Sequence, residues 1–193
     1  RSEIAEACLS EGADIINDIS SGIMDTEMMK TISKFNCPYI MMHMLGNPQN
    51  MQDSPKYKDV VIEVIKFLSQ RIKIARDLGI VDLIIDPGFG FGKTFQHNVQ
   101  LLRGLNGLAD VGRPIVVGVS RKAFVRRLAS VNQEDKDETA QVSAGLALYA
   151  ASQGAAVLRV HDVALTRTLL RAWEALALRP VDQCNVQLHG GLC

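Results

Sequence analysis

The hydrophobic and polar positions of this 193-residue chain follow two alternating patterns. Short, nearly continuous apolar runs are typical of strands buried in a parallel sheet. Longer segments follow them, in which apolar residues recur three and four positions apart, as on one face of a helix. The predicted strands are residues 13–19, 38–44, 81–86, 114–119 and 156–160. The predicted helices are residues 2–11, 25–35, 57–78, 97–109, 139–153 and 163–178. Regular alternation of strand and helix predicts an α/β fold with a parallel sheet.

The chain length limits how complete such a fold can be. A full barrel of eight βα units needs about 250 residues, whereas this chain has 193 residues and five predicted units. Residues 179–193 show neither the apolar runs typical of strands nor the three- and four-residue spacing typical of helices. We therefore predict one domain over residues 1–178 and an irregular C-terminal tail over 179–193.

Composition excludes several classes of protein. Lys plus Arg and Asp plus Glu number 21 each, so no overall charge favours nucleic acid or an anionic membrane. No stretch is apolar for the ~18 residues that a membrane span needs. The four cysteines are widely scattered, which favours free thiols in a reducing compartment. Their spacing to the histidines matches no zinc site.

Polar residues gather at the carboxyl ends of the predicted strands, where α/β folds bind their ligands. These residues are Asn17, Asp18, His43, Asp86, Ser120, Arg121, Lys122, Arg159, His161 and Asp162. The sequence therefore predicts a binding site along one rim of the sheet.

Asp86 is the strongest candidate among them, because it ends an apolar strand and three glycines alternate after it. Glycines at such positions let the backbone approach a flat or anionic ligand closely. The segment is not a phosphate-binding P-loop, since Pro87 replaces the first glycine, and Lys93 breaks the dinucleotide pattern. The alternative is a turn that only ends the strand.

Cations and hydroxyls after the last two strands predict a phosphate site. Residues 120–122 read Ser-Arg-Lys, and alternation places Arg159 and His161 on one face. Arginine offers a fixed donor fork to phosphate oxygens and lysine a mobile charge. The alternative is a solvated basic loop, with Asp162 only capping the next helix.

Asn17 and the methionine-rich segment 41–44 can be interpreted in functional or in structural terms. The amide of Asn17 both donates and accepts, which suits the edge of a heteroaromatic ring, or a structural hydrogen bond across the barrel. The methionines of residues 41–44 fit a core strand with one residue reaching the rim.

Residues 15–18, 42–52, 86–93, 120–122 and 159–163 resemble, in order and spacing, the motifs of the dihydropteroate synthase family. The resemblance covers nearly the whole chain, to about residue 178. It implies a TIM (β/α)₈ barrel that joins 6-hydroxymethyl-7,8-dihydropterin pyrophosphate to p-aminobenzoate in folate biosynthesis and releases pyrophosphate. The matched motifs correspond to the fourth through eighth strands. The resemblance thus implies an N-terminally truncated, pterin-binding barrel that lacks its first three βα units.

The resemblance also implies roles for individual residues. Asp86 and Lys122 are the implied catalytic residues. Asn17, Asp86 and Lys122 would hold the pterin, and Arg159 and His161 the pyrophosphate. Ser120 and Arg121 would lie beside the aminobenzoate, with Met42 and Phe91 as pocket walls. The sequence departs from the family at Leu45, often a polar residue there, and at Ala123, commonly serine.

The remaining expectations concern cofactor, partners and compartment. The resemblance implies magnesium bound mainly through the substrate pyrophosphate and a residue absent from this chain, with no metal ligand in the chain itself. It implies a homodimeric sulfonamide target that binds neither nucleic acid nor membrane. The compartment is the cytoplasm, or an organelle matrix if the chain belongs to a longer bifunctional protein. The alternatives are a pterin-binding methyltetrahydrofolate methyltransferase and a non-catalytic barrel fragment. The missing βα units leave open whether the isolated chain is active.

Overall fold

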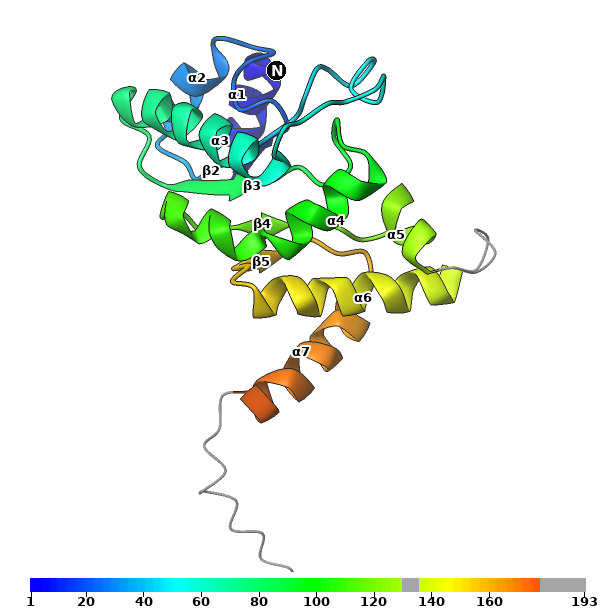
Figure 1. The fold of residues 1–193 in the computed structure, drawn as a ribbon. Coiled ribbons are helices and arrows are strands. Elements are labelled where there is room, and N and C mark those ends of the chain that lie inside the picture. Colours follow the sequence, from blue (N-terminus) through cyan, green and yellow to red (C-terminus); the bar gives the residue numbers. More distant parts are fainter. Residues whose placement is uncertain (130–135, 178–193) are drawn as a thin grey trace, which may run out of the picture.

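The computed structural model describes residues 1–129 and 136–177, in which strands and helices alternate (Figure 1). The predicted tail lies outside the described residues. The elements are α1 (Ser2–Ser10), β1 (Ile16–Asp18), α2 (Met28–Phe35), β2 (Tyr39–Met42), α3 (Val60–Asp77), β3 (Leu83–Asp86), α4 (Phe95–Arg103), the 3₁₀ helix η1 (Leu105–Val111), β4 (Val116–Val117), α5 (Ala123–Leu128), α6 (Lys136–Ser152), β5 (Val157–Leu158) and α7 (Val163–Ala177).

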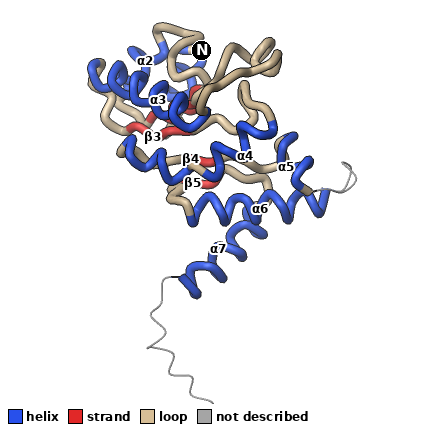
Figure 2. The backbone as a smooth tube through the Cα atoms, in the orientation of Figure 1, coloured by secondary structure: helices blue, strands red, loops and turns tan. Residues whose placement is uncertain are grey.

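All strand pairs are parallel, as the sequence predicts. β1 pairs with β2, β2 with β3, and β4 with β5. A bridge between Ile85 and Ile115 links the two groups, and the Ile85 amide donates to the Pro114 carbonyl at 2.9 Å. The strands therefore follow one another in sequence order, with helices beside them (Figure 2).

The observed strands are shorter than the predicted ones but lie inside them, because apolar residues next to a strand pack without joining its ladder. The helix predicted over residues 97–109 is wrong as a single element, since α4 ends before Gly104 and η1 follows. A Cβ at Gly104 would lie 2.7 Å from Cγ2 of Val61 in α3. This close packing needs glycine, which is a poor helix former. The sequence did not reveal α5, whose six residues are too few to show a helical period.

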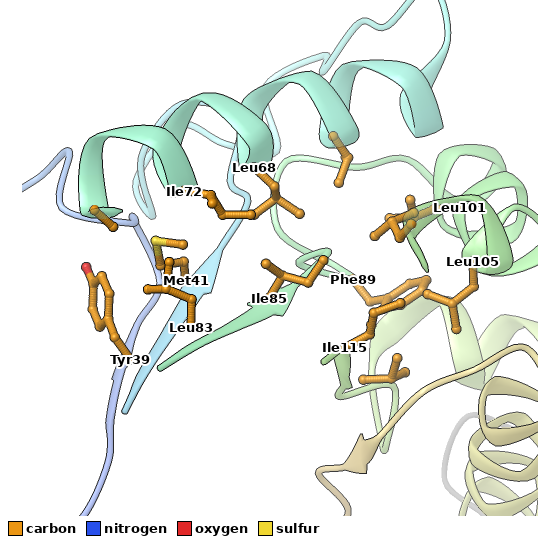
Figure 3. Packing of buried hydrophobic residues seen from close by; sticks show 14 of the residues in the cluster. Tyr39, Met41, Leu68, Ile72, Leu83, Ile85, Phe89, Leu101, Leu105 and Ile115 are labelled. Carbon is orange, nitrogen blue, oxygen red and sulfur yellow. The ribbon is translucent and has the colours of Figure 1, made fainter. Parts of the chain in front are cut away.

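One face of the sheet packs against α3 and forms the core (Figure 3). Side chains alternate between the two faces of a strand, so every second residue of β2 and β3 enters this core. The buried residues that meet there are Tyr39, Met41, Leu68, Ile72, Leu83 and Ile85. Phe89, Leu101, Leu105 and Ile115 continue the core beyond the end of β3.

The opposite face carries the candidate chemistry. The register places Asn17, Ile40 and Ile84 in one row across β1, β2 and β3. Asp86 lies two residues beyond Ile84 and therefore on the same face. The alternation that buries Ile85 against α3 thus directs Asn17 and Asp86 to the other side of the sheet.

Both ends of the strand series are open within the described residues. β1 and β5 each pair along one side only. Apolar side chains remain exposed there, with Ile15 at 47% and Val157 at 44%. This arrangement fits a partial α/β fold with parallel strands.

The glycines after β3 bring two loops of the chain together. Gly88 has φ +71°, in the left-handed region that favours glycine. A Cβ there would overlap the backbone oxygen of His43, and one at Gly92 would crowd Leu45. The structure thus shows that Gly88 and Gly92 admit the loop after β2, while the predicted approach of the glycine backbone to a ligand stays a prediction.

Two expectations from composition can be compared with the described residues. None of the helices in residues 1–129 and 136–177 is both long and apolar enough to cross a membrane. Cys8 and Cys37 are free thiols, as predicted, and Cys184 and Cys193 lie outside these ranges.

We predict that Gly88→Ala lowers the free energy of unfolding by about 3 kcal/mol or more, because the new methyl group meets backbone at a strained φ. Urea denaturation measures this loss. Gly145→Ala is the control, since a Cβ at this position in α6 would meet nothing within 4 Å. It should stabilise the protein by about 0.5–1 kcal/mol. A wild-type denaturation midpoint for Gly88→Ala would contradict this account of the loop.

Candidate functional site

Asp86 is the centre of the candidate site. Its side chain is only 1% exposed, and its two oxygens have different partners. Oδ1 accepts a hydrogen bond from the Gly88 amide at 2.8 Å, within its own turn. Oδ2 accepts from Nη2 of Arg159 at 2.7 Å, which forms an ion pair. A buried carboxylate requires such partners, because loss of its hydration is costly.

Arg159 joins three strands at the rim. It directly follows β5, and while Nη2 binds Asp86, Nη1 donates to Oδ1 of Asn17 in β1 at 2.8 Å. Gly118 lies directly against the guanidinium, since a Cβ there would be 2.6 Å from Nη2. The structure therefore brings together Asn17, Asp86 and Arg159, as the sequence predicts.

Lys122 supplies a second cation to the same rim. Its ammonium donates to the backbone oxygen of Phe89 and lies 4.9 Å from the centroid of the Phe91 ring. Burial lowers the pKa of Lys122 to about 8, with the charge of Asp86 acting upward and that of Arg159 downward. Lys122 therefore remains mostly protonated at neutral pH.

Ser120 and His161 form a separate pair beside this cluster. Nδ1 of His161 lies 2.9 Å from Oγ of Ser120, which also accepts from the His161 amide at 3.3 Å. The Arg121 side chain is exposed, and its amide donates to Oγ of Ser143. The three side chains thus have different environments: Ser120 pairs with His161, Arg121 is exposed, and Lys122 lies against the loop after β3.

Three polar residues at strand ends have structural roles. Asp18 is buried and accepts from the Tyr39 hydroxyl at 2.7 Å and from Ser20. Burial and the neighbouring Asp18 charge raise the pKa of Tyr39 above its ordinary value. Asp162 caps α7 by accepting from the Leu165 amide, as the structural alternative predicts.

His43 is the third of these, and it belongs to a buried cluster around Lys93. The Lys93 ammonium donates to the backbone oxygens of Gly88 at 2.9 Å and Phe91 at 3.1 Å, and lies 2.9 Å from Nδ1 of His43. Burial and the Lys93 charge lower the pKa of His43 to about 3, so the ring is neutral and Nδ1 can accept. Lys93 therefore ties the loop after β3 to the end of β2.

Sequence reasoning missed this role of Lys93. In the sequence, Lys93 only excludes a dinucleotide motif. Its position directly after three alternating glycines is the signal that its ammonium could bind backbone oxygens of the preceding loop. Burial lowers the pKa of Lys93 to about 7, while Asp86 acts upward and Lys122 downward.

A cavity of about 600 Å³ opens between the loop after β3 and α5. Phe91 and Lys122 line it, together with Gln52 and Arg127, which the sequence did not single out. Met42 is buried and is not among the lining residues. This volume lies in the range of small-molecule sites.

The described residues do not fit a magnesium site of their own. Within residues 1–129 and 136–177, no three or more His, Cys, Asp and Glu side chains are grouped so that they could hold a metal ion. We therefore assign no reaction step to a metal.

Comparison with known proteins agrees with this geometry. Residues 1–161 match the family of pterin binding enzymes. The chain is 42% identical over 168 residues to the dihydropteroate synthase of Haemophilus influenzae, covering 86% of this chain and 60% of that protein.

Solved structures give the same result. The dihydropteroate synthase of Xanthomonas albilineans in complex with 7,8-dihydropteroate has a TM-score of 0.84 and 37% identity, covering 93% of this chain and 65% of that one. The Thermus thermophilus enzyme in complex with 4-aminobenzoate has a TM-score of 0.85 and 38% identity, covering 91% and 71%. The same enzyme is also known in complex with 6HMPPP. The chain spans about three fifths of the curated relatives that it matches.

We predict that Lys93→Met flattens the rise of stability with pH between pH 7 and 10. In this window the unfolded chain keeps the proton of Lys93, because its ordinary pKa is 10.5, whereas the native state releases it above about 7. Because the unfolded state binds more protons, native stability rises with pH. Urea midpoints at pH 7 and pH 10 measure the slope. Lys66→Met, at an exposed position in α3, should keep the wild-type slope. Equal slopes for wild type and Lys93→Met would contradict the burial of this charge.

Proposed function

Because the chain belongs to the pterin-binding enzymes, and among them to the dihydropteroate synthase family, we propose that it condenses a dihydropterin pyrophosphate with p-aminobenzoate. The products are 7,8-dihydropteroate and pyrophosphate. The observation that carries the proposal is the buried Asp86 carboxylate at the rim. Arg159 holds this carboxylate, and its charge acts to raise the pKa of the nearby Lys122. The pterin-binding methyltransferase is not favoured, since the relatives named above are synthases.

Asp86 recognises the donor edge of the pterin. A pterin presents a ring N–H and an exocyclic amine side by side, and a carboxylate accepts from both. In the structure, Nη2 of Arg159 donates one hydrogen bond to Oδ2 of this carboxylate, while Nη1 donates to Asn17. The pterin edge presents two adjacent donors to this same carboxylate, so the ligand takes the place of Arg159 at Asp86. Asn17, now bound to Arg159, becomes available to the ring as well.

The displaced arginine then serves the pyrophosphate. Arg159 side-chain exposure is 44%, so its guanidinium can turn toward solvent and a phosphate group. His161 is exposed at the same rim, while Ser120 binds its Nδ1 and orients the ring. Lys122, mostly charged at neutral pH, meets the ring carbonyl and N5 of the pterin.

The reaction is a dissociative substitution at the pterin methylene. The C–O bond breaks, leaving positive charge on the pterin and negative charge on the departing pyrophosphate. The amine of p-aminobenzoate then forms the C–N bond and loses a proton. Asp86 stabilises the cation, and Arg159 and His161 stabilise the leaving group, so their interactions strengthen toward the transition state.

The chain represents the C-terminal five βα units of a (β/α)₈ barrel. Open edges at β1 and β5 support this interpretation, as does the share of the relatives that the chain covers. Three further βα units would lie between these edges and cover Ile15 and Val157. The homodimer, the magnesium bound through pyrophosphate, the role as a sulfonamide target and the compartment stay predictions of the family resemblance.

We predict that Asp86→Asn lowers the rate of pyrophosphate release by about 10²-fold or more, as expected for loss of one preorganised charge. A coupled phosphate assay with both substrates measures the rate. Asp110→Asn removes an exposed carboxylate from η1 and should leave the rate unchanged. Near-normal turnover of Asp86→Asn would refute the assignment. If the wild-type chain binds pterin pyrophosphate tightly but shows no turnover, the chain is a binding fragment and not an active synthase.

A further inference from the structure

The cavity beside the Asp86 rim combines aromatic rings with positive charge. Four phenylalanines line it, among them Phe91 and Phe95, together with the cations Lys93, Lys122 and Arg127. No aspartate or glutamate is among the lining residues that the structure describes. Flat apolar walls with unbalanced positive charge suit an aromatic ligand that carries an anionic group.

Two of these cations already have partners. The Lys93 ammonium is shared among two backbone oxygens and the ring of His43. Lys122 donates to the backbone oxygen of Phe89 and faces the rim, where it interacts with the charge of Asp86. Neither is therefore free to neutralise an anion in the cavity.

Arg127 is the cation that remains available. Within the described part of the chain, its guanidinium makes no hydrogen bond or ion pair, and it lies 4.4 Å from the centroid of the Phe95 ring. This stacking holds the plane of the guanidinium and leaves its N–H edges free. Such an edge binds a carboxylate through two parallel hydrogen bonds.

Helix α5 places this arginine on the cavity wall. Ala123 and Arg127 are four residues apart in α5, so both lie on one helix face, and both line the cavity. The small side chain of Ala123 leaves space between Lys122 at one end and Arg127 at the other.

We propose that Arg127 binds the carboxylate of p-aminobenzoate and so makes the site select an aromatic acid over a neutral aromatic amine. This inference rests on the proposed function, because it takes the aminobenzoate as the occupant of the cavity. With its carboxylate on Arg127 and its ring against Phe91, the ligand directs its amine toward Lys122 and the pterin at Asp86. Arg127 is thus a specificity-determining residue on an element that the sequence did not predict.

The test compares p-aminobenzoate with the neutral 4-aminobenzamide by ligand-observed NMR titration of the full chain. Arg127→Gln should weaken p-aminobenzoate binding about tenfold or more, as loss of a charge-assisted pair predicts. Its effect on 4-aminobenzamide should stay within about twofold, because that ligand has no charge to lose. Arg127→Lys should recover part of the affinity for the acid. Arg103→Gln removes an exposed arginine at the end of α4, outside the cavity lining, and should change neither ligand.

Several outcomes overturn the inference. These are equal weakening of both ligands by Arg127→Gln, no preference of the wild type for the acid, no detectable binding of the acid, or the same loss in Arg103→Gln. Pterin pyrophosphate titration and pyrophosphate release, measured on the same proteins, test the proposed function separately. Wild-type turnover with an unchanged KM for p-aminobenzoate in Arg127→Gln removes only the inference. Arg127-dependent binding of the acid without pterin binding removes only the proposed function.

Discussion

The ion pair between Asp86 and Arg159 is the interaction on which the rim depends. It joins side chains 73 residues apart in sequence, spanning from β3 past β4 to the end of β5. A carboxylate that is 1% exposed needs a charged partner and a backbone donor, and here Arg159 and the Gly88 amide provide them. The same arginine reaches Asn17 in β1. One side chain therefore connects the first and last described strands, and a ligand that displaces it breaks its contacts with both Asp86 and Asn17.

The loop after β3, which Lys93 binds, holds Asp86 in place. Gly88 donates to the carboxylate from a loop that lies against His43, and Lys93 binds that loop at two backbone oxygens. The loop carries Phe89 and Phe91, which direct Lys122 toward the rim. Burial of Lys93 is unfavourable for its charge, as its lowered pKa shows. The structure thus gives up stability to hold a preorganised positive environment around one carboxylate, which suits a ligand with a donor edge and an anionic tail.

The sequence predicts the alternation of elements, the parallel pairing and the rim, because these follow from hydrophobic periods and from strand direction. It places Asn17, Asp86 and Arg159 together, since all three lie toward the carboxyl ends of predicted parallel strands. It does not distinguish Asp18 or His43, at comparable strand ends, from ligand-binding residues. Their hydrogen bonds to Tyr39 and Lys93 depend on tertiary packing. Arg127 was hidden for a related reason, because α5 is too short for periodicity to reveal which of its residues face a cavity.

The central claim is that the pterin edge takes the place of Arg159 at Asp86. A crystal structure of the chain with dihydropterin pyrophosphate bound tests it most directly. The account predicts both oxygens of Asp86 within hydrogen-bond distance of the ring N–H and the exocyclic amine, with Arg159 turned to the pyrophosphate. A pterin bound elsewhere while Asp86 and Arg159 remain paired would contradict it.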